Sequence, residues 1–110
     1  MSNEIDLEND EEWLALVAGF RTHFWQTRVP ELLTAWAEAR ELPQASWPAD
    51  LKRSIHGIAG SAGLIGYDSL GSEARKVDRM WDVSTLSSEE LMQGIEHLVE
   101  CIVKVAGEQD

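Results

Sequence analysis

Apolar residues recur every three or four positions along almost the whole chain, and this spacing most strongly constrains its fold. Such spacing places the apolar side chains on one face of an α-helix. No segment alternates apolar and polar residues in the way that a half-buried β-strand does. The C-terminal part of the chain gives the clearest stripe, formed by Leu91, Ile95, Leu98, Ile102 and Val105. The sequence therefore predicts an all-α fold.

Glycine, proline and serine residues divide the chain into five predicted helices. A first helix is expected from about Glu11 to Thr27. Its buried face is expected to comprise Trp13, Val17, Phe20 and Phe24. Pro30 is expected in the first turn of a second helix that fades near Glu41, because a proline there lacks only an N–H that would have no partner. The remaining helices are predicted at about 48–65, 68–81 and from 88 onward.

Two further sequence signals mark helix boundaries, one at a helix end and one at a helix start. Gly66 is expected to end the third helix in a left-handed conformation. Ser87 and Glu90 have the spacing of a capping box before the fifth helix. Four long amphipathic helices joined by short links bury their apolar faces best as an antiparallel four-helix bundle, with the additional N-terminal helix capping one end or flanking one side. We assign residues 1–10 to an acidic lead-in and residues 11–107 to one bundle domain.

The charge balance of the chain restricts its partners. The formal net charge is -11 at pH 7. This charge disfavours binding to nucleic acids and anionic membranes, because those negatively charged surfaces bind proteins through Lys and Arg. Cys101 is the only cysteine, so no internal disulfide is possible. No apolar run approaches the roughly 20 residues that a bilayer requires, and the acidic N-terminus lacks the pattern of a signal peptide. We expect a cytoplasmic protein, and a monomer.

The segment from His56 to Gly63 is the most informative for function. It places one histidine beside three glycines, Gly57, Gly60 and Gly63, within a predicted helix. Glycine costs a helix interior about 1 kcal/mol relative to alanine, so this pattern indicates that something large must approach the imidazole. Gly60 lies one turn after His56, and Lys52 lies one turn before it on the same face.

These residues fit phosphoryl transfer. Histidine can form a covalent phosphoryl intermediate, and the ordinary pKa of imidazole, about 6.5, leaves a neutral nucleophile at cytosolic pH. Phosphoryl transfer needs little from a protein beyond positioning and charge stabilisation. The ammonium of Lys52 is a candidate point charge for a phosphoryl group.

The segment His56-Gly57-Ile58-Ala59-Gly60-Ser61-Ala62-Gly63 resembles the core motif of histidine phosphotransfer (HPt) domains, H-x-x-[K/A]-G-x-x-G. The resemblance implies a four-helix bundle, often with an extra N-terminal helix. It also implies that His56 is phosphorylated and relays the group between aspartates of receiver domains in two-component phosphorelays. Gly60 is then the small residue that clears space for the receiver. Mg²⁺ is expected on the partner receiver domain, and no cofactor or metal is expected on this chain.

One departure from the family pattern concerns positive charge. Many members carry a lysine three residues after the histidine, where this chain has Ala59. Lys52 is the first candidate to replace that charge. The other candidates lie on the fourth predicted helix and are Arg75, Lys76 and Arg79.

Three alternatives stay open beside a phosphocarrier. The chain could be a non-catalytic acidic adaptor, or an HPt-derived protein without phosphotransfer, that binds a receiver domain or kinase. The dimerisation helix of a sensor kinase fits less well, because Gly57 rather than an acidic residue follows His56. An independent enzyme is least favoured, because the sequence shows no second catalytic group paired with His56. His23 is interpreted as half-buried and His97 as an outward-pointing surface residue.

Overall fold

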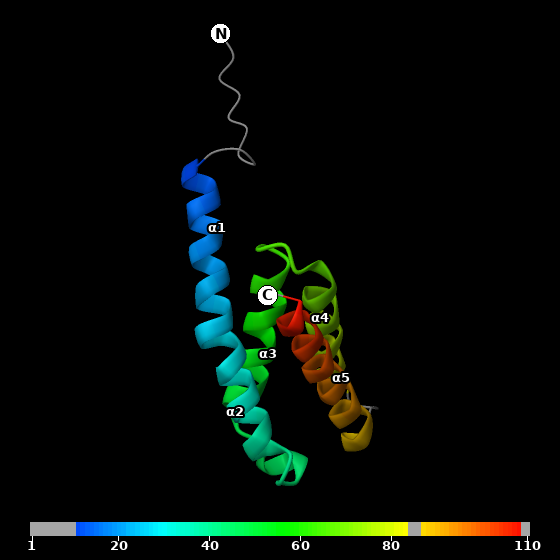
Figure 1. Cartoon of the computed structure of the whole chain (residues 1–110). Helices are drawn as coiled ribbons and strands as arrows, with labels where there is room; N and C mark the ends of the chain where they lie inside the picture. Colours follow the sequence, from blue (N-terminus) through cyan, green and yellow to red (C-terminus); the bar gives the residue numbers. More distant parts are fainter. Residues whose placement is uncertain (1–10, 84–86, 109–110) are drawn as a thin grey trace.

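The computed structural model describes residues 11–83 and 87–108, and every regular element among them is helical (Figure 1). The α-helices are α1 (Glu11–His23), α2 (Val29–Ala39), α3 (Ala49–Ala62), α4 (Asp68–Trp81) and α5 (Ser88–Gly107). A π-helical segment η1 (Phe24–Arg28) joins α1 to α2, and a 3₁₀ turn η2 (Gln44–Ser46) precedes α3. The predicted acidic lead-in lies outside the described residues, as does the end of the turn after α4.

Pro30 lies in the first turn of α2, as predicted, but α2 is not separated from the helix before it. The segments α1, η1 and α2 continue one another as a single long rod, and the residue before α2, Arg28, is itself helical. Proline lacks an N–H and its ring clashes with the carbonyl four residues earlier, which normally breaks a helix. Here the backbone widens instead, and the N–H of Val29 bonds to the carbonyl of Phe24, five residues back. The π-helical turn therefore accommodates the proline without ending the helix.

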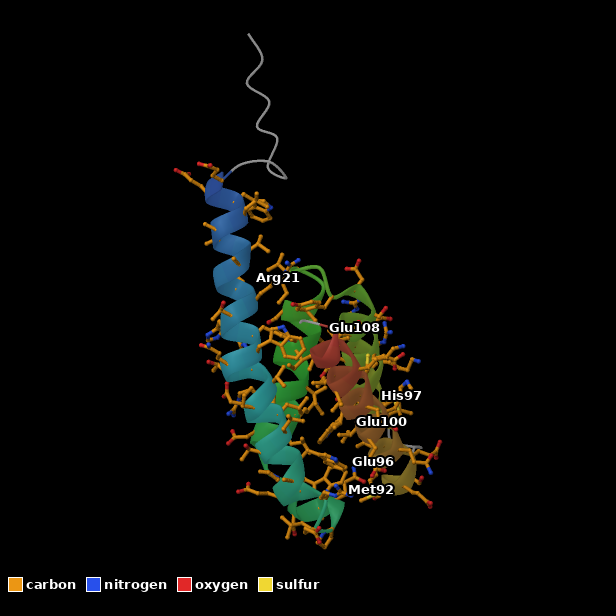
Figure 2. The ribbon with its side chains drawn as sticks, in the orientation of Figure 1. Arg21, Met92, Glu96, His97, Glu100 and Glu108 are labelled. Carbon is orange, nitrogen blue, oxygen red and sulfur yellow. The ribbon has the colours of Figure 1, made fainter. Side chains whose placement is uncertain are left out.

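Of the expected buried face of the first helix only Phe24 is buried, while Trp13 and Val17 are half-buried and Phe20 is exposed. No residue of α1 is buried, and the large side chains of Leu14, Leu16 and Phe20 are exposed. Phe24, at the start of η1, is the first buried residue of the rod. Most of α1 projects past the turn between α3 and α4, and Arg21 reaches that turn by donating from Nε to the carbonyl of Ile65 at 2.9 Å (Figure 2). The Arg21 guanidinium also lies 5.6 Å from the centre of the Tyr67 ring, so α1 flanks the bundle only at its C-terminal end and extends beyond it for most of its length.

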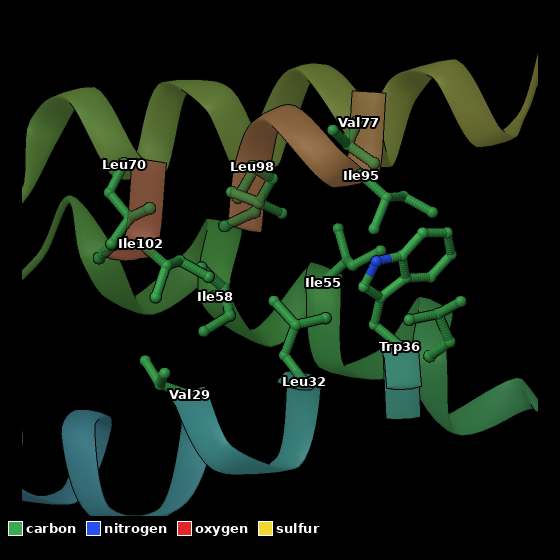
Figure 3. Close-up of a cluster of buried hydrophobic side chains, with 14 of the residues drawn as sticks. Val29, Leu32, Trp36, Ile55, Ile58, Leu70, Val77, Ile95, Leu98 and Ile102 are labelled. Atoms are coloured by element: carbon green, nitrogen blue, oxygen red, sulfur yellow. The ribbon is translucent and has the colours of Figure 1, made fainter. Parts of the chain in front are cut away.

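The other helices pack side by side in an antiparallel bundle. Helix α3 contacts α2 on one side and α4 on the other, and α4 contacts α5. The core lies where the apolar faces of α2, α3, α4 and α5 meet (Figure 3). Helical spacing gives the third helix an apolar stripe whose members are all buried, namely Leu51, Ile55, Ile58, Ala62 and Ile65. In α2 the buried face includes Ala35 and Ala39, while Leu33 and Ala37 are exposed.

Both predicted boundary signals, at the end of the third helix and at the start of the fifth, are confirmed. Gly66 has a φ of 96°, a conformation that favours glycine. The N–H of Tyr67 bonds to the carbonyl of Ala62, and the N–H of Gly66 bonds to that of Gly63, which together form a Schellman end to α3. At α5, Ser87 and Glu90 form the capping box. None of the described helices is both long and apolar enough to span a membrane.

Candidate functional site around His56

His56 lies on the outer face of α3, and 76% of its side chain is exposed. Its Nδ1 lies 2.9 Å from Oδ2 of Asp78 on α4, whose side chain is 23% exposed. A carboxylate only accepts hydrogen bonds, so this contact places the ring proton on Nδ1. Nε2 then carries the free lone pair of the neutral ring. The arrangement holds the imidazole in one orientation with its nucleophilic nitrogen facing away from α4.

Sequence reasoning missed Asp78. It lies 22 residues after His56, and only the register between α3 and α4 brings the two together. A second ion pair between α3 and α4 joins Lys52 to Asp82. It lies one helical turn from the His56–Asp78 contact and has the same register. Lys52 and His56 are four residues apart, as are Asp78 and Asp82. The sequence alone does not show which residue of α4 faces which residue of α3. His56 therefore has a carboxylate partner that the sequence alone does not show.

Lys52 is engaged with α4 rather than free for a phosphoryl group. Its Nζ lies 2.8 Å from Oδ1 of Asp82. This hydrogen bond, with smaller attraction from the charges of Asp82 and Asp78, raises the pKa of Lys52 above its ordinary value of 10.5 in spite of slight desolvation. The predicted point charge thus lies one turn from His56 but on the seam between α3 and α4.

The glycines around His56 differ in what surrounds them. A Cβ atom added to Gly60 would have no heavy atom within 4 Å, so the surface beside His56 is open there. Gly63 instead lies on the α3–α4 seam, where a Cβ on Gly71 would be 3.0 Å from the Gly63 nitrogen. Gly71 thus permits close helix packing, whereas a Cβ on Gly63 would meet only Nη1 of Arg75 at 3.7 Å. Ala59, at the position of the family lysine, is buried at 7% exposure.

The cations of α4 are not equivalent. The guanidinium of Arg75 lies over the glycine seam, where its Nη1 would be 3.7 Å from a Cβ on Gly63. Lys76 turns toward Glu73, with an Nζ–Oε1 distance of 3.6 Å. Arg79 is exposed. None of these cations has a described contact with His56.

A depression of about 330 Å³ opens beside Gly60, between α3 and the rod formed by α1 and η1. Its lining residues are Phe20, His23, Phe24, Arg28, Gly60, Ser61, Leu64 and Ile65. His23 is exposed rather than half-buried as predicted, because the open depression separates it from α3. Leu64 is 67% exposed, whereas Ile65 is 3% exposed and belongs to the core. Leu64 therefore provides the apolar surface at this edge.

His97 lies on α5 and is exposed, as predicted (Figure 2). Its Nε2 is 3.5 Å from Oε2 of Glu73. Within the described part of the chain, no three His, Cys, Asp or Glu side chains gather in a way that could hold a metal ion. Comparisons with family models, with curated proteins and with solved structures find no match to this chain.

Proposed function

We propose that this chain is a histidine-containing phosphotransfer protein that relays a phosphoryl group between receiver-domain aspartates through His56. One observation carries the proposal. An exposed histidine on a rigid helix is held through Nδ1 by Asp78 at 2.9 Å, beside a glycine with open space around it. A structural histidine has no need of that combination, whereas a phosphoryl carrier needs a fixed nucleophile with room for a bulky donor.

The chemistry of one transfer step follows from this geometry. The lone pair of Nε2 attacks the phosphorus of a receiver's aspartyl phosphate. A P–N bond forms, the P–O bond to the aspartate breaks, and the carboxylate leaves with the electron pair. Nδ1 keeps its proton, so the ring becomes positively charged, and the adjacent Asp78 carboxylate offsets that charge. Mg²⁺ on the receiver balances the charge on the phosphoryl oxygens. The return to a second receiver is the same step reversed.

The surface around His56 suits transient docking of a protein domain. Gly57 and Gly60 flatten α3 next to the nucleophile, and Phe20 and Leu64 supply exposed apolar area around the depression beside Gly60. One surface must serve a donor and an acceptor in turn, which favours a modest contact area. We place this relay in the cytoplasm and assign it to a monomer.

The test is phosphoryl uptake from a panel of phosphorylated receiver domains with Mg²⁺. We expect an acid-labile, base-stable phosphoryl group on the wild-type chain and none on His56→Gln. His97→Gln is the matched control, because His97 is also exposed and also faces a carboxylate of α4. Labelling of His56→Gln would refute the assignment. Binding of receivers without any labelling of the wild type would instead favour the non-catalytic adaptor.

A further inference from the structure

The π-helical segment η1 brings an arginine to the surface of α3 next to His56. The segment η1 contacts α3, and Arg28 is the last residue of η1. A π-helical turn holds one residue more than an α-helical turn, so it rotates the residues around it relative to a regular helix. Such turns are frequent at functional sites. Here the turn accommodates Pro30 and sets the direction of Arg28.

The guanidinium of Arg28 lies against the backbone of Gly57, the residue immediately after His56. A Cβ on Gly57 would be 3.0 Å from Nη1 of Arg28, 3.7 Å from Cζ and 3.9 Å from Cδ. Any other residue at position 57 would therefore displace the guanidinium. This contact gives Gly57 a role that access to His56 alone does not explain.

Arg28 lies on the side of α3 that Nε2 of His56 faces. Nδ1 points toward Asp78 on α4, and the two ring nitrogens point to opposite sides of the imidazole, so Nε2 points away from α4. Lys52 and Arg75 lie on the α4 seam, behind the ring. Arg28 comes from the opposite flank, and Gly60, whose surroundings are open, lies on the surface between that flank and the ring.

The charge of Arg28 is available. Among residues 11–83 and 87–108, no carboxylate forms an ion pair with it, in contrast to Lys52 and Arg53, which pair with Asp82 and Asp50. Arg28 lines the depression beside Gly60 and also a second, larger one between η1, α2 and the start of α3. Its exposed side chain is thus bordered by open space on both sides, and the larger depression is also lined by Glu31, Glu38 and Asp50.

We propose that Arg28 is the cation that holds the phosphoryl group on His56, in place of the lysine that the HPt motif would put at Ala59. The inference rests on the proposed function. A guanidinium presents N–H donors in a planar fork that matches two phosphate oxygens, so it suits this task better than a flexible ammonium. The charge comes from a neighbouring helix because Ala59 is buried against the core.

The experiment separates contact with the phosphoryl group from docking of the receiver. Phosphoramidate, a small chemical donor, is used to phosphorylate the full-length chain without any receiver, and ³¹P NMR then follows the titration of the phosphoryl group. A nearby guanidinium favours the dianion. The phosphoryl group of Arg28→Gln is therefore expected to titrate at higher pH than that of the wild type, with Arg28→Lys between them. Arg40→Gln, at the far end of α2, is the control and should match the wild type.

The second readout is the rate of transfer from a phosphorylated receiver. Loss of a charge-assisted hydrogen bond predicts a rate about tenfold lower in Arg28→Gln and unchanged in Arg40→Gln. If Arg28→Gln matches the wild type in both readouts while the wild type is labelled on His56, the role of Arg28 is refuted and the relay stands. If the wild type accepts no phosphoryl group from any receiver, the relay itself fails and the role of Arg28 fails with it.

Discussion

His56 and His97 form two outwardly similar sites on opposite parts of the bundle. Both histidines are well exposed, at 76% and 65% of their side chains. Each faces a carboxylate of α4, Asp78 or Glu73, and each lies near a depression of about 330 Å³. A histidine–carboxylate pair on a helix surface is therefore not by itself a mark of function in this molecule.

The surroundings of the two histidines differ in charge and in space. The depression near His56 is lined by Arg28 and His23 and by no carboxylate of the described chain. The one at His97 is lined by Glu73 and Glu90, which repel a phosphoryl dianion, and by Lys76, whose ammonium lies 3.6 Å from Glu73. Gly60 is open, whereas a Cβ on Gly94, one turn before His97, would be 3.1 Å from the sulfur of Met80. Only His56 combines an oriented ring, an accessible neighbour and an available cation.

The largest effect after loss of His56 itself is expected from filling the open space beside it. Gly60→Arg places a long side chain over the docking surface and should slow phosphotransfer by about 100-fold, because a small misplacement of reacting groups costs that much. Gly107→Arg is the control, since a Cβ there also has no neighbour within 4 Å. Both variants should keep the far-UV circular dichroism of the wild type. Transfer at the wild-type rate by Gly60→Arg would show that partners do not approach from this side.

A smaller effect is expected from the carboxylates that face the two histidines. Asp78→Asn removes the charge that orients His56 and offsets its positive charge after phosphorylation. We expect the rate of phosphotransfer to fall about tenfold, as is common when the partner of a functional imidazole is changed. Glu73→Gln, the matching change opposite His97, should leave the rate unchanged. Equal rates for the wild type and Asp78→Asn in single-turnover transfer would reduce that contact to a surface ion pair.

These sites show how far the sequence alone could lead. The apolar stripes of α3 and α5 identified the core, because helical spacing and burial are directly linked. The motif around His56 identified the candidate nucleophile and the open glycine. Asp78 and Arg28 escaped detection because their proximity to His56 depends on how α3 packs against α4 and η1. The packing of many side chains sets that register, so no local sequence pattern predicts it.

The errors on the first helix have a similar origin. Helical spacing from Trp13 to Phe24 indicates an apolar face, but it cannot show whether a neighbouring helix is long enough to cover that face. Helix α3 ends at the Gly66 turn, so α1 extends past its partner. Pro30 predicts a helix start because proline favours that position, and it lies in the first turn of α2. The widened π-helical turn that joins α2 to the preceding helix has no comparable sequence signature.

Stability measurements should separate the open glycine from the packed one. Gly60→Ala adds a methyl group in open space on a helix and should stabilise the fold by about 0.5–1 kcal/mol, because alanine loses less backbone entropy on folding. Gly71→Ala should destabilise the fold by about 1 kcal/mol, since its Cβ would lie 3.0 Å from the backbone nitrogen of Gly63 and force α3 and α4 apart. Urea unfolding gives both values. The same sign for the two variants would contradict the distinction between an access glycine and a packing glycine.

The smallest effect concerns the lysines that accompany the two histidines. Lys52 lies 2.8 Å from Asp82, whereas Lys76, near His97, lies 3.6 Å from Glu73. The hydrogen bond to Asp82 raises the pKa of Lys52 in the folded state, so its charged form stabilises the fold at pH values below the unfolded value of 10.5. That contribution is lost as the pH rises through the raised folded pKa. Lys52→Gln should therefore lower the urea midpoint slightly at pH 7, and the difference from wild type should shrink as the pH rises from 10.5 through the raised folded pKa.

Lys76→Gln is the matched control and should change the urea midpoint less than Lys52→Gln at pH 7, because its ion pair is longer. The phosphotransfer rate of Lys52→Gln should stay close to that of the wild type, since Asp82 holds the ammonium on the side of the ring away from Nε2. A large loss of phosphotransfer in Lys52→Gln, with Arg28→Gln unaffected, would reverse the assignment and make Lys52 the cation of the site. The two variants together thus decide from which flank of α3 the phosphoryl group is held.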